Sequence, residues 1–157
     1  MNHQVVLAKL SILGIGGNLY KWIKSFLLDR TQHVLVNGFL STPSHVKSGV
    51  PQGSVIGPLL FLILIGDIDA DLQNSSLQSF ADDTRISKGV NSLRDVSLLQ
   101  HDLVIVYKWA IENNMLFNSK KLEVIRYGPN NHLKEQTSYL APDKSTIPEK
   151  NISGILV

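Results

Sequence analysis

Apolar residues recur every three or four positions in two stretches near the start of the chain. They predict one helix over residues 3–13 and a second over residues 19–28. Three glycines lie between these stretches: Gly14, Gly16 and Gly17. Glycine is typical after the last helical residue, so they indicate the end of the first helix. A phosphate-binding loop is rejected, because no strand precedes these glycines and no Lys-Ser or Lys-Thr pair follows at the required spacing.

The next segment predicts a hairpin followed by a long helix. β-Branched residues favour a strand over 31–36, and Asn37-Gly38 is a strong hairpin turn, so the return strand is expected at residues 45–48. Pro51-Gln52-Gly53 interrupts this pattern. Ser54 is then suited to cap a helix that runs to about Leu72. Because apolar side chains almost encircle residues 59–65, we expect this helix to be buried.

Short strands and one further helix fill the rest of the chain. Two strands at residues 77–81 and 84–86 are expected to meet at Asp82-Asp83, and Ser92 is expected to open a helix that ends near Asn113-Asn114. Further strands are predicted at residues 115–117, 122–127 and 138–140 and from residue 152 onward. Helices and hairpins alternate without regular βαβ units, so the fold class is α+β, in a single domain.

Composition excludes several classes of protein. Hydrophobic residues make up 43% of the 157 positions, which is enough for a core, and there is no cysteine for disulfides, thiol catalysis or a cysteine-ligated zinc. The five histidines show no ligand spacing, so they receive no role. The start of the chain lacks a signal peptide, and Gly57, Pro58, Gly66 and Asp67 interrupt its most apolar run. We therefore expect an intracellular protein, cytoplasmic or nuclear, and disfavour a membrane-associated helix protein.

Charge is distributed unevenly along the sequence. Residues 1–60 carry a net charge of +4, residues 61–119 carry −4, and residues 120–157 carry +2. An acidic centre between basic flanks is typical of a metal-assisted phosphate site, although chance produces the same distribution in many domains. The acidic pair Asp82-Asp83 has two interpretations as well. Aspartate is a common solvated turn residue, but adjacent carboxylates are also suited to Mg²⁺, which binds through one or two carboxylates and keeps its other positions for water and phosphates.

The sequence around this pair resembles a known family. Residues 48–61, Ser-Gly-Val-Pro-Gln-Gly-Ser-Val-Ile-Gly-Pro-Leu-Leu-Phe, are followed about twenty positions later by Phe-Ala-Asp-Asp-Thr at residues 80–84. Both motifs and their spacing are similar to the reverse transcriptases of LINE-type (non-LTR) retrotransposons, nearest to the jockey and chicken-repeat branch. Segments on both sides, residues 22–38 and 109–121, extend the resemblance over nearly the whole chain.

The resemblance implies the palm subdomain of an RNA-directed DNA polymerase. Its palm-type sheet would pack on helices, and two Mg²⁺ ions would serve nucleotide transfer to a primer 3′-hydroxyl. Asp82 would be the direct metal ligand and Asp83 a weaker one. Pro51, Gln52 and Gly53 would shape the pocket for the template base and the incoming deoxynucleotide triphosphate. The partners implied are an RNA template and a DNA primer.

One further residue falls on a family position, and one family residue has no counterpart. Lys121 matches a position near the triphosphate, although a solvated lysine at a strand edge explains it equally well. The family places another metal-binding aspartate on a strand before the segment that begins here at Asn2, whereas residues 1–28 contain no Asp or Glu. We therefore expect residues 1–157 to form a partial reverse transcriptase domain, a palm fragment without fingers and thumb. The alternative is a non-catalytic remnant or a recruited nucleic-acid-binding or protein-binding module.

Overall fold

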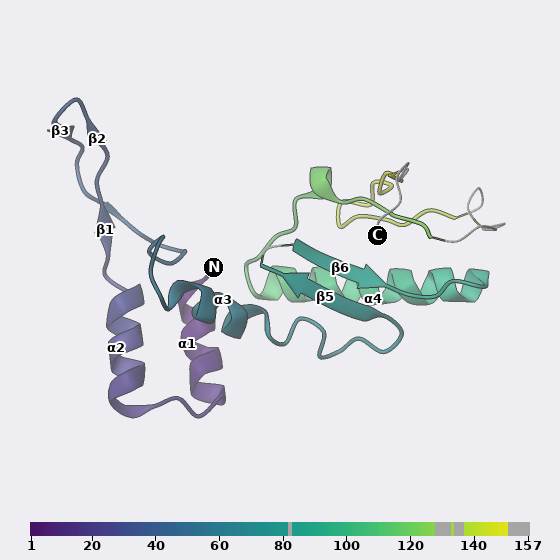
Figure 1. Ribbon diagram of the computed structural model, residues 1–157, viewed down its shortest axis with the longest axis horizontal. Helices are drawn as coiled ribbons and strands as arrows, with labels where there is room; N and C mark the ends of the chain where they lie inside the picture. Colours follow the sequence, from purple (N-terminus) through teal and green to yellow (C-terminus); the bar gives the residue numbers. More distant parts are fainter. Residues whose placement is uncertain (82, 128–132, 134–136, 151–157) are drawn as a thin grey trace. The chain divides into compact units, whose positions relative to one another are not determined.

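The computed structural model describes residues 1–81, 83–127, 133 and 137–150 (Figure 1). The chain divides into two compact units, one of residues 1–67 with 113–115 and the other of residues 68–112 with 116–157. In the described part, helices accompany two-stranded antiparallel sheets, so the α+β class is confirmed. No helix among the described residues has both the length and the apolar character needed to cross a membrane.

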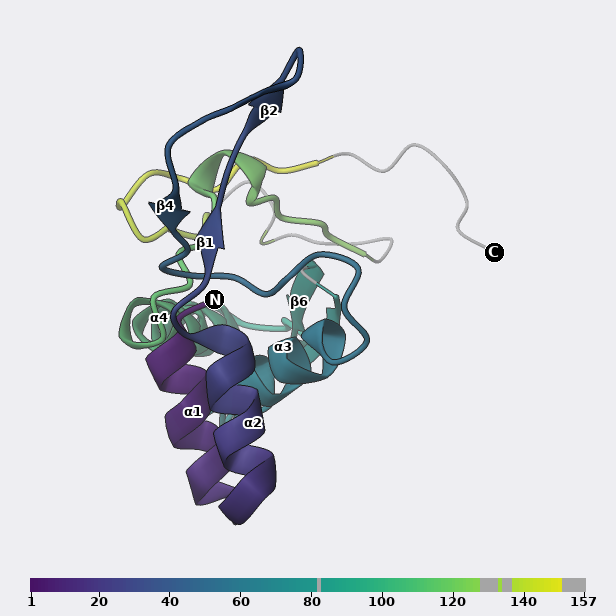
Figure 2. The same ribbon diagram turned by 90° about the vertical axis from the view of Figure 1, so that its left-hand side faces the viewer.

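Three helices hold the core of the first unit: α1 (His3–Ile12), α2 (Gly17–Leu27) and α3 (Gly57–Ile65). The Asn2 side chain caps α1 by accepting hydrogen bonds from the first turn, and α1 and α2 lie side by side in both views (Figures 1 and 2). The two predicted helices near the start of the chain are therefore confirmed. The buried apolar side chains come from all three helices: Val6, Leu7, Leu10, Ile23, Leu27, Leu60 and Leu64.

The helix predicted from Ser54 to Leu72 is shorter than expected. Helix α3 begins after Ile56, with Pro58 in its first turn, and the Ser54 hydroxyl makes no capping bond. Burial is also confined to one side, since Leu59 and Leu62 are more than half exposed. The first turn of α3 is packed closely against the preceding loop, because a Cβ added at Gly57 would lie 2.8 Å from the Ser54 hydroxyl oxygen.

An antiparallel arm extends from the end of α2 in the first unit (Figures 1 and 2). Strand β1 (Thr31–Gln32) pairs with β4 (Ser44–His45), and β2 (Leu35–Val36) pairs with β3 (Phe39–Leu40) across the predicted Asn37-Gly38 turn. Both turn residues have positive φ, as a tight hairpin requires. The predicted turn is confirmed, but the strand expected at 31–36 is divided into β1 and β2, and the return strands lie at Phe39–Leu40 and Ser44–His45 rather than at residues 45–48.

The tip of this arm is apolar and exposed. Residues 31–46 contain no Asp, Glu, Lys or Arg. Five large apolar side chains near the tip are each more than half exposed: Val34, Leu35, Val36, Phe39 and Leu40. The arm therefore presents an uncharged, largely apolar surface.

The second unit contains a hairpin, a long helix and a short 3₁₀ turn. Strand β5 (Ser76–Phe80) pairs with β6 (Asp83–Ser87), and both precede α4 (Leu93–Glu112) and η1 (Ser119–Lys121). The Ser92 hydroxyl accepts a hydrogen bond from the Asp95 amide, which confirms that Ser92 opens α4. A second core joins α4 to later residues: Tyr139, Ala141 and Ile147, packed against Val96, Leu99, Leu103, Leu122 and Val124.

The strands predicted after α4 do not form as regular strands. Residues 115–117 have no strand, residues 122–127 have one bridge from Val124 to Glu149, and Leu140 has one bridge to Thr146. The strand predicted from residue 152 onward lies outside the described residues. The observed sheets are accordingly three separate two-stranded pairs within the described residues, rather than one continuous palm-type sheet.

Candidate functional site

The predicted Pro51-Gln52-Gly53 motif forms a turn in the first unit, between β4 and α3. The Ser54 amide donates to the Pro51 carbonyl at 3.2 Å, and Gly53 has a φ of +77°. A side chain at this backbone conformation is strained, so glycine is the residue that this turn requires. The Gln52 side chain is exposed. Its amide is therefore available to donate and accept hydrogen bonds.

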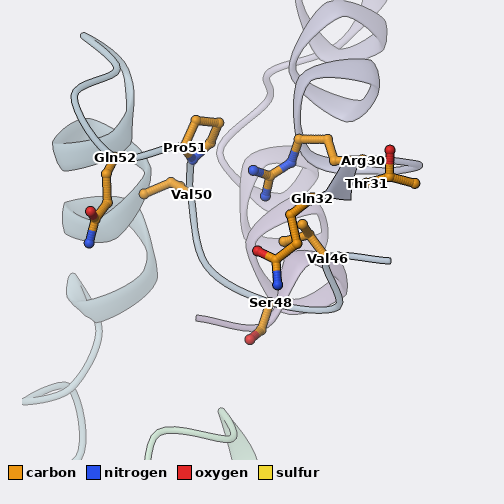
Figure 3. Close-up of a pocket in the computed structure, with 8 residues that line it drawn as sticks. All are labelled: Arg30, Thr31, Gln32, Val46, Ser48, Val50, Pro51 and Gln52. Carbon is orange, nitrogen blue, oxygen red and sulfur yellow. The ribbon is translucent and has the colours of Figure 1, made fainter. Parts of the chain in front are cut away.

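An open pocket of about 640 Å³ lies beside this turn (Figure 3). Its walls come from the start of the arm and from the segment that leads into the turn: Arg30, Thr31, Gln32, Val46, Ser48, Val50, Pro51 and Gln52. In Figure 3 the Arg30 guanidinium points toward Val50 and Pro51, and the Gln32 side chain points toward Ser48. The pocket thus presents one cation and several neutral polar groups.

Sequence reasoning identified only part of this pocket. Pro51 and Gln52 were predicted, whereas Arg30, Gln32 and Ser48 received no role. Arg30 follows the last turn of α2, and its Nε donates to the Leu27 carbonyl at 3.1 Å. The sequence offered one signal that could have indicated Arg30, namely a single cation at the start of an otherwise uncharged stretch.

The predicted acidic hairpin is present in the second unit. Five residue pairs join β5 and β6, from Ser76 with Ser87 to Phe80 with Asp83. Asp83 is therefore the first residue of β6, and its side chain is exposed. Asp82 lies outside the described residues. The register confirms the predicted hairpin, but Asp83 belongs to β6 and is paired with Phe80, whereas the sequence placed both aspartates in the turn.

A buried carboxylate fixes the base of this hairpin. Asp102 in α4 is fully buried, and it accepts hydrogen bonds from the Asn74 amide at 2.9 Å and from the Asn74 side chain at 3.1 Å. The Lys88 ammonium donates to the Asn74 carbonyl at 3.0 Å. Asn74 precedes β5 and Lys88 follows β6, so these bonds hold both ends of the hairpin together.

Hydrogen bonding also determines the charge state of Asp102. Burial by itself would raise the pKa of this carboxyl, but the bonds from Asn74, together with the neighbouring Ser75 and His101 side chains, outweigh burial and hold the pKa below its ordinary value of 3.8. Asp102 is therefore a carboxylate at neutral pH. Since both of its oxygens are occupied by Asn74, Asp102 acts as a structural anchor of the hairpin.

Lys121 is exposed on η1 rather than at a strand edge, and no described hydrogen bond or ion pair joins it to Asp83. Asp67, one of three aspartates that follow α3, is paired with Lys9 at 2.5 Å. Among the described residues, no three His, Asp or Glu side chains gather in a way that could hold a metal ion. The carboxylate of Asp83 nevertheless has the donor chemistry that Mg²⁺ prefers, and its exposure leaves room for metal-bound water.

Comparison with known proteins identifies the family. Residues 2–146 match the family described as reverse transcriptase (RNA-dependent DNA polymerase). The chain is 36% identical over 111 residues to the RNA-directed DNA polymerase from mobile element jockey of Drosophila melanogaster. It is 34% identical over 99 residues to the probable RNA-directed DNA polymerase from transposon BS of the same organism.

These alignments cover much of this chain but little of its relatives. They include 66% and 58% of the residues here, and 12% and 11% of the jockey and BS polymerases respectively. No solved structure matches the chain. The family match extends over nearly all of the sequence and includes both motifs on which the resemblance was based. The chain therefore belongs to the reverse transcriptase family, and its relatives include the polymerases of jockey-type mobile elements.

Proposed function

We propose that this chain carries part of the nucleotidyl-transfer centre of an RNA-directed DNA polymerase, with a palm-type arrangement in the whole enzyme. The register of the β5–β6 hairpin is the observation that carries this proposal. It makes Asp83 the first residue of a strand and leaves only Ala81 and Asp82 between the paired strands. Adjacent carboxylates repel each other, and a cation between them removes that cost. Asp82 and Asp83 would therefore hold Mg²⁺.

The bound metal would supply charge neutralisation at the triphosphate and activation of the primer 3′-hydroxyl. The other residues act on the substrates themselves. Gly53 allows the backbone to approach a base closely, Pro51 limits the shape of the turn, and Gln52 offers both a donor and an acceptor. Lys121 would neutralise charge on the triphosphate or donate a proton to the leaving pyrophosphate. The substrates would be an RNA template, a DNA primer and deoxynucleotide triphosphates.

Paramagnetic NMR tests the metal site directly. Mn²⁺, added alone as a stand-in for Mg²⁺, is expected to broaden the amide signals at the β5–β6 turn, and excess Mg²⁺ should reverse the effect. The double variant Asp82→Asn/Asp83→Asn should abolish this broadening. Asp71→Asn is the matched control, because it removes one exposed aspartate of the same acidic segment.

The outcomes separate the two functional hypotheses. Broadening that persists in the double variant, or that centres on residues 67–71, would contradict the proposed metal site. A chain that binds an RNA–DNA hybrid equally well with and without Asp82 and Asp83, and shows no Mn²⁺ effect, would favour a non-catalytic binding module instead. Localised broadening together with binding of the hybrid would support the polymerase centre.

A further inference from the structure

The segment that leads into the Pro51–Gly53 turn is fixed at Gly49. Its amide donates to the Met1 carbonyl at 2.9 Å, and Ser48 forms a bridge with Asn2. Gly49 has a φ of +85°, a conformation that directs the chain toward Pro51 and that side chains rarely adopt. The backbone before the turn is therefore held against the first residues of the chain, 46 or more positions away.

Two side chains meet at the Gly49 carbonyl. The ring nitrogen Nε2 of His3 lies 2.7 Å from this oxygen, and Nη2 of Arg30 donates to it at 3.0 Å. At 2.7 Å the imidazole nitrogen must carry the hydrogen, because two acceptors would repel each other at this distance. His3 Nε2 also lies 3.3 Å from Arg30 Nη2, so two donors converge on one acceptor. The carbonyl thus receives both of its possible hydrogen bonds.

Arg30 connects this point to a helix end. While Nη2 binds Gly49, Nε binds the Leu27 carbonyl in the last turn of α2. The positive charge of the guanidinium is favourable at a helix C-terminus, where carbonyl groups lack helical partners. In the described part of the chain, no carboxylate lies within ion-pair distance of Arg30. The guanidinium consequently binds backbone carbonyls and also lines the pocket beside Pro51 and Gln52.

His3 is suited to a fixed position rather than to ligand binding. Its side chain is only 4% exposed, and it belongs to the first turn of α1. Its ring therefore cannot rotate freely, and its donor is directed at Gly49. Together α1, the end of α2 and the loop before the turn form one hydrogen-bonded junction.

We propose that His3 and Arg30 are positioning residues for the Pro51–Gly53 turn, acting through the Gly49 carbonyl. This inference rests on the proposed function, because the turn is taken to contact template and nucleotide. The junction sets the position of the turn in two ways. It fixes the backbone two residues before Pro51, and it holds the Arg30 guanidinium at the pocket wall.

Amide hydrogen exchange on the full 157-residue chain tests the junction without any ligand. His3→Leu and Arg30→Met each remove one donor to the Gly49 carbonyl while keeping similar bulk, and Arg30→Met also removes the bond to the Leu27 carbonyl. Exchange at the Gly49 and Ser54 amides is expected to accelerate about tenfold in each variant, because each loses a bond to the carbonyl before the turn. His3→Gln keeps an N–H donor and should restore most of the protection. Lys47→Met is the control for charge, since Lys47 is an exposed cation of the same segment.

A second measurement tests positioning. The dissociation constant of a deoxynucleotide triphosphate is measured with an RNA template–DNA primer present. It should rise about tenfold in His3→Leu and Arg30→Met. It should stay near the original value in His3→Gln and Lys47→Met. Exchange at Leu10 and Leu60 amides, in the core of the first unit, reports whether a variant still folds. If His3→Leu does not fold, Arg30→Met and Arg30→Lys provide the comparison.

Each outcome has a distinct meaning. Unchanged exchange at Gly49 and Ser54 in folded His3→Leu and Arg30→Met would overturn the junction. Faster exchange with unchanged nucleotide affinity would overturn the positioning role. If the original chain binds no nucleotide, the proposed function fails, while the exchange measurement still decides whether His3 and Arg30 hold the turn. Faster exchange, weaker binding and rescue by His3→Gln together would support the inference.

Discussion

Replacement of Asp102 should destabilise the β5–β6 hairpin and the unit that contains it. Asp102 is fully buried and accepts two hydrogen bonds from Asn74. A hydrogen bond to a charged group contributes about 1.5–3 kcal/mol. Replacement by alanine also removes the cost of burying the carboxylate charge, which offsets part of this loss. For Asp102→Ala we therefore expect a decrease of about 3 kcal/mol in the free energy of unfolding.

Asp102→Asn separates charge from shape in the same experiment. The asparagine side chain keeps one acceptor oxygen, but its NH₂ group replaces the other. That NH₂ group faces a donor of Asn74, so one hydrogen bond is lost and two donors face each other. We expect a decrease of about 2 kcal/mol in the free energy of unfolding. The assay is urea denaturation monitored by circular dichroism. The free energies of unfolding are compared with the same slope of free energy against urea concentration for each variant. A loss below about 0.5 kcal/mol for Asp102→Ala, in the range of ordinary surface substitutions, would refute the anchoring role.

The same anchor should show a defined dependence on pH. Hydrogen bonds from Asn74, together with the neighbouring Ser75 and His101 side chains, outweigh burial and lower the pKa of Asp102 below 3.8 in the folded state. A carboxyl whose pKa is lower when folded contributes stability above its unfolded pKa, and this contribution is lost as the pH falls through the folded value. The gap in the free energy of unfolding between the original chain and Asp102→Ala should stay constant from pH 7 to about pH 5 and narrow below about pH 4. A gap that widens on acidification would contradict this assignment.

Gly57→Ala should lower the free energy of unfolding by about 1 kcal/mol, because its Cβ would lie 2.8 Å from the Ser54 hydroxyl, and Ser54→Ala should relieve part of that loss in the double variant. Lys9→Met should lower the urea midpoint more than Asp67→Asn does, because the Lys9 ammonium also donates to the Leu64 carbonyl in α3. Phe39 lies at the exposed apolar tip of the arm, so Phe39→Ser should reduce both the binding of a hydrophobic dye and aggregation measured by light scattering. Unchanged dye binding and unchanged light scattering would assign dye binding and aggregation to another surface. The 157-residue chain on its own should bind Mg²⁺ weakly but fail in a primer-extension assay, because residues 1–28 offer no carboxylate to complete a two-metal site; incorporation abolished by Asp82→Ala would disprove this.

Local signals predicted the helices and tight turns well. The glycines after α1, the serine before α4 and the Asn37-Gly38 pair each act through neighbouring backbone groups, so the sequence carries their information directly. The length of α3 was overestimated because Ile68 and Leu72 continue the apolar spacing of a helix beyond Ile65, where α3 ends. Its start was misplaced because Ser54 resembles a capping residue, whereas Pro58 and the tight contact at Gly57 set the first turn.

Features that depend on distant partners were harder to predict. β-Branched residues favoured a strand over 122–127, but a strand also needs a neighbour, and among the described residues this segment forms one bridge, from Val124 to Glu149. The acidic hairpin was predicted because its two strands adjoin in sequence. The role inferred for His3 had no local signal, since its partner Gly49 lies 46 positions later. Asp102 gave no signal either, because an aspartate in a predicted helix is usually solvated.

The contact between the first residues and Gly49 has a consequence for synthesis on the ribosome. Met1 and His3 emerge first, yet the carbonyl and amide that bind them emerge 46 or more residues later. At translation rates of about 5–20 residues per second, this delay is roughly 2–9 s, much longer than the microseconds in which a helix forms. During this interval α1 and α2 can form, while the buried position of His3 stays open to water. The contact that buries His3 is therefore expected to await residue 49, and a nascent chain arrested before that point should be more sensitive to protease at the start of α1 than one arrested after it.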